Sequence, residues 1–119
     1  MPEINTFQAG GSLLSEILNE AVKNGADSLP KGRELAPYLE AFEDKDLVET
    51  CFALFENDLN VSRTAAGLYM HRNTLIYRIA KLKRLTGLDV CSFSDAVSFI
   101  ILYRSYLEDV KSNGTKRKG

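Results

Sequence analysis

The sequence predicts an all-α protein, and three observations support this prediction. Apolar residues recur along most of the chain at the three- and four-residue spacing of amphipathic helices. Residues that start and stop helices flank these segments, among them Asp44 before one and Gly87 after another. No segment shows the convincing apolar–polar alternation of a half-buried strand. We therefore expect a small helical bundle.

The N-terminal part of the chain predicts an arm followed by a helix. Residues 1–11 are polar and end in two glycines, so we expect a flexible arm. Ser12 is placed to cap a helix that continues to Asn24, where Gly25 follows as a stop signal. Residues 26–33 contain a proline and a glycine and are expected to form a connector.

A short helix is expected over residues 34–40, entered or bent at Pro37. It would complete an N-terminal helical segment, residues 12–43, that serves dimerisation or packing. Asp44 is then the expected cap of a helix that reaches about Asn57 and opens a second unit, residues 44–111.

Two helices joined by a very short turn are predicted inside the second unit. Ser62 is the expected cap of the first helix, which reaches about Tyr69. The small side chains of Ala65 and Ala66 would let the two helices approach closely. The second helix is long and basic and is expected over residues 72–86. Together they indicate a helix-turn-helix.

The last predicted helix begins at Ser92 or Ser94 and runs to about Val110, followed by a tail over residues 112–119 that is expected to be disordered. This helix is apolar around most of its circumference, whereas a surface helix shows one apolar stripe. It is therefore either central or covered by a partner. We expect a homodimer, with a monomer that buries the helix unaided as the alternative.

Charge is concentrated in one part of the chain. Residues 61–88 contain six Lys or Arg residues and no Asp or Glu, although the net charge of the whole chain is −1. An ordinary solvated helix face mixes both signs, whereas an acid-free basic block is typical of a nucleic-acid-binding surface. The acidic N-terminal third would repel DNA, so we expect it to face away from a duplex or to pack on a second subunit.

Helical geometry predicts which side of the basic helix faces outward. At about 100° per residue, Leu75, Ile79 and Leu82 share one face. Asn73, Tyr77 and Arg84 lie in nearly the opposite direction. Amide, phenol and cationic groups of this kind bind base edges and phosphates.

The run from Asn60 to Leu88, with HRNTLIYR at 71–78 and LTGL at 85–88, closely resembles the C-terminal helix-turn-helix of PucR/CdaR-type bacterial regulators, which is related to the Fis-type fold. The resemblance covers about residues 30–110. It implies a cytoplasmic transcriptional regulator that binds double-stranded DNA sequence-specifically, with the helix that starts at Arg72 in the major groove. Fis-like domains bind as dimers, which agrees with the expected homodimer.

Two departures from the family pattern matter. The family usually carries this module after a sensory domain, so the resemblance allows for an upstream sensory domain or partner that these 119 residues do not contain. The family also commonly has acidic residues late in the recognition helix, where this chain has Lys83 and Arg84, and this difference suggests stronger attraction to phosphates.

Candidate DNA-binding residues fall into two sets. Side chains expected to contact bases occupy the first turns of the recognition helix: Arg72, Asn73, Thr74 and Tyr77. Side chains expected to contact phosphates flank them: Ser62, Arg63, Thr64, His71, Arg78, Lys81 and Arg84. For Arg78, a bond to an acidic residue within the chain is an equal alternative.

Other function classes are disfavoured. The sequence shows no paired catalytic groups, metal-ligand spacing, cofactor loop, secretory signal or membrane span, so we expect no enzyme, metal, cofactor or membrane association. Cys51 and Cys91 are expected to be reduced and mostly buried. Two alternatives remain: a helical protein-interaction module, and a nucleoid-type DNA binder of low specificity.

Overall fold

The computed structural model describes residues 13–25 and 28–118, and every regular element in this part of the chain is helical. The all-α prediction is therefore confirmed. The expected arm and the expected cap at Ser12 lie outside the described residues. The elements follow in the order α2 (Leu13–Asn24), the 3₁₀ helix η2 (Gly32–Tyr38), α3 (Leu39–Phe42), α4 (Lys45–Glu56), α5 (Val61–Gly67), α6 (Arg72–Thr86) and α7 (Phe93–Lys118).

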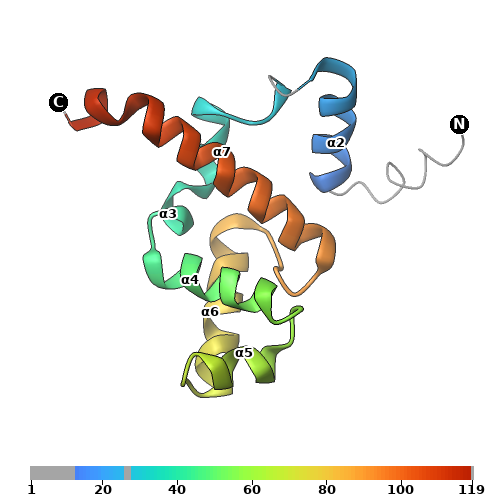
Figure 1. Cartoon of the computed structure of the whole chain (residues 1–119), viewed down its shortest axis with the longest axis vertical. Helices are drawn as coiled ribbons and strands as arrows, with labels where there is room; N and C mark the ends of the chain where they lie inside the picture. The colour runs from blue at the N-terminus through green and yellow to red at the C-terminus, as the bar shows by residue number, and fades with distance from the viewer. Residues whose placement is uncertain (1–12, 26–27, 119) are drawn as a thin grey trace, which may run out of the picture.

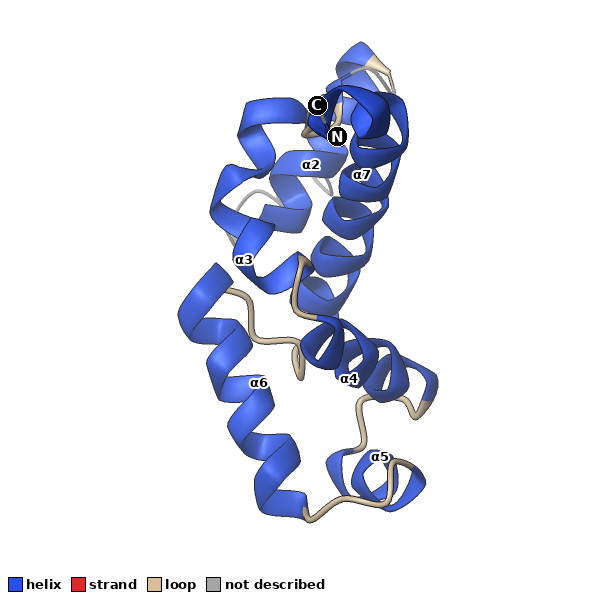
Figure 2. Ribbon diagram, turned by 90° about the vertical axis from the view of Figure 1, so that its left-hand side faces the viewer, coloured by secondary structure: helices blue, strands red, loops and turns tan. Residues whose placement is uncertain are grey.

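The helices are arranged so that one end of the molecule is formed by α5 and the start of α6 (Figure 1). α2 and the end of α7 lie at the opposite end, and α4 lies between them. Figure 2 shows α6 running from this α5 end back toward α3. The two predicted units pack on each other, because α2 and η2 contact α7 while η2 and α3 contact α6.

An aromatic cluster connects α3, α4 and α7. The rings of Phe42 and Phe99 meet edge to face with centroids 5.4 Å apart, and Phe55 lies 5.8 Å from Phe99. Phe99 and Leu102 of α7 are fully buried. Edge-to-face pairs add to the stabilisation that burial provides. α7 is thus central to the core, which is one of the two alternatives that its apolar sequence left open.

Capping residues account for where several helices begin and end. One carboxylate oxygen of Asp44 accepts the backbone N–H groups of Asp46 and Leu47 at 3.1 and 3.2 Å, which confirms Asp44 as the cap of α4. Gly25 and Gly87 follow α2 and α6 with φ of +82° and +83°, a left-handed conformation that disfavours side chains. The N–H of Gly87 donates to the carbonyl of Lys83 over 2.7 Å.

Three local predictions are corrected. Asn60, not Ser62, caps α5, because its side-chain oxygen accepts the N–H of Arg63 at 2.8 Å. α5 ends at Gly67 rather than near Tyr69. The segment around Pro37 is a 3₁₀ helix followed by the short α3, since proline has no N–H and clashes with a preceding α-helical turn.

The C-terminal prediction is also wrong, because α7 continues to Lys118 rather than ending near Val110. Residues 112–118 were expected to be disordered on polar composition. They contain no proline, however, and Gly114 retains its N–H, so a helix that begins in the core can continue through them at a cost of about 1 kcal/mol for the glycine.

The two cysteines differ in exposure. Cys51 is buried in the core as expected, whereas Cys91, in the turn before α7, is exposed and corrects the expectation of two buried thiols. Both are free thiols. Across the described ranges, no helix is both long and apolar enough to cross a membrane.

Candidate nucleic-acid interface

The turn between α5 and α6 is short and tightly hydrogen-bonded. Tyr69 has a left-handed backbone, with φ of +56°, and the N–H of Met70 donates to the carbonyl of Ala65 over 3.0 Å. His71 is extended, and its carbonyl accepts the N–H of Leu75 in the first turn of α6. The chain thus reverses within residues 68–71 and begins α6 beside α5 at the end of the molecule (Figure 2).

The inner face of α6 agrees with the predicted angles. Leu75 and Leu82 are fully buried, and Ile79 is partly buried against the core. In α5, Ala65 is buried, as expected for a residue that lets α5 and α6 approach closely. Ala66 is exposed, so it does not contribute to this contact between the helices.

The outer face of α6 carries the side chains that were expected to contact bases. Arg72, Asn73 and Thr74 are exposed in its first turn, and Tyr77 is 59% exposed one turn later. All four therefore share the solvent side of α6. Polar side chains in the first turns of such a helix are the groups that contact base edges in helix-turn-helix proteins.

The residues expected to contact phosphates divide into several groups. Ser62 and Arg63 at the start of α5 are exposed, as are His71 and Arg84. Thr64 is fully buried, and its hydroxyl donates to the carbonyl of Asn60 over 2.7 Å. The predicted phosphate contact of Thr64 is therefore wrong, because the fourth residue of α5 faces inward.

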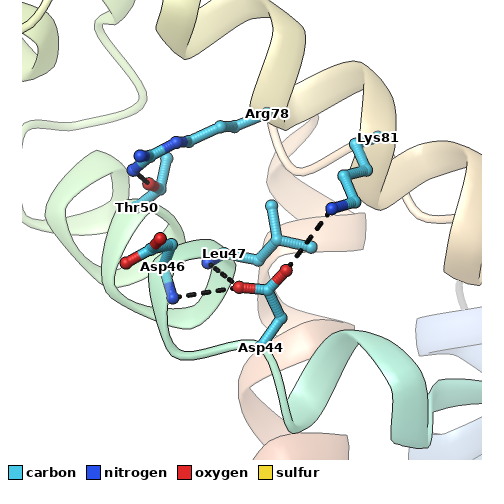
Figure 3. A network of polar contacts seen from close by, with 6 residues as sticks. All are labelled: Asp44, Asp46, Leu47, Thr50, Arg78 and Lys81. Atoms are coloured by element: carbon cyan, nitrogen blue, oxygen red, sulfur yellow. Dashed lines mark hydrogen bonds and ion pairs between the residues drawn. The ribbon is translucent and has the colours of Figure 1, made fainter.

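Arg78 corrects a second phosphate prediction. Its guanidinium Nη1 donates to Oγ1 of Thr50 over 3.0 Å, and Thr50 is buried in α4 (Figure 3). The alternative, a bond to an acidic residue, is correct only in part: Arg78 makes a bond within the chain, but the acceptor is a hydroxyl and not a carboxylate. Arg78 thus joins α6 to α4.

Lys81 also lies toward α4. Its Nζ is 3.5 Å from Oδ2 of Asp44, while Oδ1 of the same carboxylate caps α4 (Figure 3). Both side chains remain about one third exposed, and ion pairs of this kind contribute about 0.2–1 kcal/mol. Lys81 can therefore exchange this pair for a phosphate at little cost.

The structure adds Tyr69 to the candidate interface. Its side chain is 95% exposed, although its backbone is in the left-handed region that costs a side-chain-bearing residue about 1–2 kcal/mol. Strained, exposed residues of this kind often occur at functional sites. One signal in the sequence was available: a very short turn without glycine between two helices forces some other residue into this conformation.

The charge of this surface is predominantly positive. Arg63, Arg72, Lys83 and Arg84 are exposed on α5 and α6, and neither helix contains an acidic residue. Among the described residues, no group of three or more His, Cys, Asp or Glu side chains is placed to hold a metal ion.

A basic helix with one buried face, an exposed polar first turn and a short turn from a preceding helix defines a helix-turn-helix domain. Residues 47–104 match the PucR C-terminal helix-turn-helix domain family. This part of the chain belongs to that family, which is a DNA-binding domain of transcriptional regulators and not an enzyme family.

Curated relatives agree with the family. The chain is 40% identical over 60 residues to the transcriptional activator PmfR of Paenarthrobacter nicotinovorans, covering 50% of this chain and 13% of that protein. It is 44% identical over 45 residues to the purine catabolism regulatory protein of Bacillus subtilis, covering 38% and 8%. It is 31% identical over 84 residues to the carbohydrate diacid regulator of Escherichia coli, covering 70% and 22%.

The chain therefore spans less than a quarter of the length of these relatives. No solved structure matches the chain significantly.

Proposed function

We propose that the chain binds double-stranded DNA sequence-specifically, as the DNA-binding part of a bacterial transcriptional regulator. The observation that carries the proposal is the exposed first turn of α6, where Arg72, Asn73 and Thr74 project at one end of the molecule. The 15-residue α6 is about 22 Å long, and the major groove is about 12 Å wide and admits one α-helix.

The base-contacting roles follow from side-chain chemistry. Arg72 can donate two hydrogen bonds to a guanine, and Asn73 can pair in bidentate fashion with an adenine. The methyl group of Thr74 suits the methyl group of a thymine, and Tyr77 extends the same surface one turn further along α6. Recognition would thus be concentrated at the start of α6.

The phosphate-contacting roles belong to the residues around this turn. Ser62 and Arg63 of α5 and His71 before α6 are exposed beside it, and Arg84 extends the positive charge along α6. Lys81 would join them by leaving Asp44. Such contacts position the protein on the duplex without reading its sequence. Any ligand response would come from a sensory domain or partner outside these residues.

The experiment begins by selecting duplexes from a random pool and measuring binding to the selected and a scrambled duplex at two salt concentrations. Asn73→Ala is expected to weaken binding to the selected duplex by about 5- to 150-fold, the loss of one base contact of about 1–3 kcal/mol. Its binding to the scrambled duplex should change little.

Two further variants complete the design. Arg84→Ala should weaken binding to both duplexes and reduce the salt slope by about one unit. Lys23→Ala is the matched control, because Lys23 is an exposed cation on α2 at the opposite end of the molecule (Figure 1). Equal affinity for selected and scrambled duplexes would indicate a low-specificity binder. Absence of salt-dependent DNA binding would favour a protein-interaction module.

A further inference from the structure

An aliphatic side chain is partly exposed on α6 among polar and cationic ones. Ile76 is 41% exposed, whereas Leu75 beside it is fully buried and Ile79 is partly buried against the core. At about 100° per residue, four exposed residues of α6 lie within about 60° of Ile76: Arg72, Asn73, Ala80 and Lys83. Ile76 is therefore an apolar group on the most basic helix of the chain.

The contacts of α6 with α4 show which side of α6 is left free. Arg78 and Lys81 both bond to side chains of α4 or of its cap (Figure 3). Around the axis of α6, Ile76 lies about 160° from Arg78 and about 140° from Lys81. Ile76 is thus on the side of α6 that faces away from α4.

Helical spacing also places Ile76 among the side chains proposed to contact bases. The residues Asn73, Ile76, Tyr77 and Ala80 occupy positions i, i+3, i+4 and i+7, which share one side of an α-helix. When Asn73 and Tyr77 meet base edges, Ile76 between them meets the floor of the same groove. This step rests on the proposed function, because it takes Asn73 and Tyr77 as base contacts.

The major groove offers an aliphatic side chain one apolar group. Each base pair presents hydrogen-bond donors and acceptors there, and thymine adds a methyl group at C5. We propose that Ile76 is a specificity-determining residue that packs on the C5 methyl group of a thymine. Ala80, one turn further along, has a small side chain that leaves room for this approach.

The charges around Ile76 support DNA as the occupant of this side of α6. Arg72 and Lys83 are exposed cations on either side of Ile76 along the helix, and α6 contains no acidic residue. Phosphates border the major groove and attract such cations, while the thymine methyl group lies on its floor. A wholly apolar partner would instead remove water from both cations without supplying an opposite charge.

The first test removes only the methyl group from the DNA. Each thymine of the selected duplex is replaced in turn by uracil, which pairs with adenine in the same way and lacks the C5 methyl group. The unmodified chain should bind at least one substituted duplex about fourfold more weakly, which corresponds to the loss of one buried methyl group. Fluorescence anisotropy at a fixed salt concentration measures these affinities.

Protein variants then assign an affected thymine to its side chain. Ile76→Ala should bind the parent duplex about fourfold more weakly and should no longer distinguish thymine from uracil at the position that Ile76 contacts. Ile76→Val removes one methyl group and should reduce this discrimination to about twofold. Thr74→Ser removes the other methyl group that is proposed to contact a thymine, and it should keep the discrimination that Ile76→Ala loses.

The matched control is Val22→Ala. Val22 is 86% exposed on α2, and its replacement shortens a β-branched helical residue in the same way as Ile76→Ala. This control should leave both the affinity and the discrimination between thymine and uracil unchanged. Binding of the scrambled duplex depends on phosphates, so Ile76→Ala should keep it, and that binding shows that the variant is folded.

The outcomes separate this inference from the proposed function. Equal binding of the selected and scrambled duplexes by the unmodified chain would refute the proposed function and the role of Ile76 with it. A preference for the selected duplex that no uracil substitution weakens, or a discrimination that survives Ile76→Ala, would refute only the role of Ile76. If Ile76→Ala also lost the scrambled duplex, unchanged discrimination in Ile76→Val would refute that role.

Discussion

The guanidinium of Arg78 donates a 3.0 Å hydrogen bond to the hydroxyl of Thr50, a residue of α4 that is only 2% exposed. Arg78 belongs to the most basic part of the chain, yet it serves the contact between α6 and α4. The ion pair of Lys81 with Asp44 joins the same two helices one turn further along (Figure 3). The basic block thus contributes both to the candidate interface and to the support that orients α6.

Replacing Arg78 should destabilise the fold. Arg78→Ala is expected to lower the free energy of unfolding by about 1–2 kcal/mol, because the buried Thr50 hydroxyl loses a charged donor. Arg84→Ala removes an exposed cation from the same helix and should change stability by less than about 0.5 kcal/mol. Urea unfolding of both variants measures the difference. Equal stabilities would show that the Arg78–Thr50 bond does not support α6.

The two carboxylate oxygens of Asp44 should contribute separately to the free energy of unfolding. Asp44→Ala removes the cap of α4 and should cost about 1 kcal/mol. Asp44→Asn keeps a capping oxygen and loses only the exposed ion pair with Lys81, so it should cost less than about 0.5 kcal/mol. Glu49→Gln, which neutralises another exposed acid of α4, is the control for charge. The prediction is refuted if Asn and Ala at position 44 are equally destabilising in thermal unfolding.

Two glycines should respond in opposite directions to the same substitution. Neither Gly87 nor Gly67 has a heavy atom within 4 Å of an added Cβ, so space does not distinguish them. Gly87 has φ of +83°, and Gly87→Ala should cost about 1–2 kcal/mol. Gly67 is helical, and Gly67→Ala should stabilise by about 0.5 kcal/mol. Chemical unfolding measures whether each substitution raises or lowers the free energy of unfolding. A change in the same direction for both variants would contradict the argument from backbone conformation.

Burial of Cys51 predicts a loss of stability at alkaline pH. Burial, and secondarily the nearby Cys91, raises the pKa of the Cys51 thiol from 9.0 to about 12. The stabilisation that this raised pKa gives the folded state is complete below pH 9. This stabilisation falls as the pH rises from 9 to 12, because the thiol ionises in the unfolded chain before it ionises in the folded one.

The pH prediction is measured by urea unfolding between pH 7 and 10.5. Cys51→Ala should be less stable at pH 7 because it loses buried volume, but its stability should decline less steeply above pH 9. Cys91→Ala removes the exposed thiol, which is the smaller cause of the raised pKa, and should therefore keep most of the decline above pH 9. Parallel profiles for the unmodified chain and Cys51→Ala would contradict the raised pKa.

Ser98 predicts a stabilising substitution. Its hydroxyl is fully buried in α7 and has no hydrogen-bond partner among the described residues. Ser98→Ala should therefore raise the free energy of unfolding by about 0.5–1 kcal/mol, because a buried polar group without a partner is removed. Ser105→Ala, at a partly exposed position of α7, is the control that measures the effect of the higher helix propensity of alanine. The prediction fails if the two substitutions have the same effect on the thermal midpoint.

The faces of α6 were predictable because its pattern is long and regular. Leu75 and Leu82 are buried and Asn73 and Tyr77 exposed, as the angle of about 100° per residue required. α5 has only seven residues, which is too few for helical periodicity to show which side faces inward. The sequence therefore wrongly indicated Ser62 as the cap and Thr64 as an exposed residue. Short elements depend on single hydrogen bonds, such as the one that Asn60 accepts from Arg63, and composition does not reveal these.

The sequence alone determined the helical class, the helix-turn-helix and the inner and outer sides of α6, because each depends on spacing within one segment or on an acid-free run of charge. Only the tertiary structure decided which cations remain free. Arg78 is directed to Thr50 and Lys81 to Asp44 because α4 packs against α6, and that packing joins residues that are 28 or more positions apart. The side of α7 that stays exposed, at Phe93 and Leu107, was likewise decided by the packing of the other helices, since its apolar sequence nearly encircles the helix.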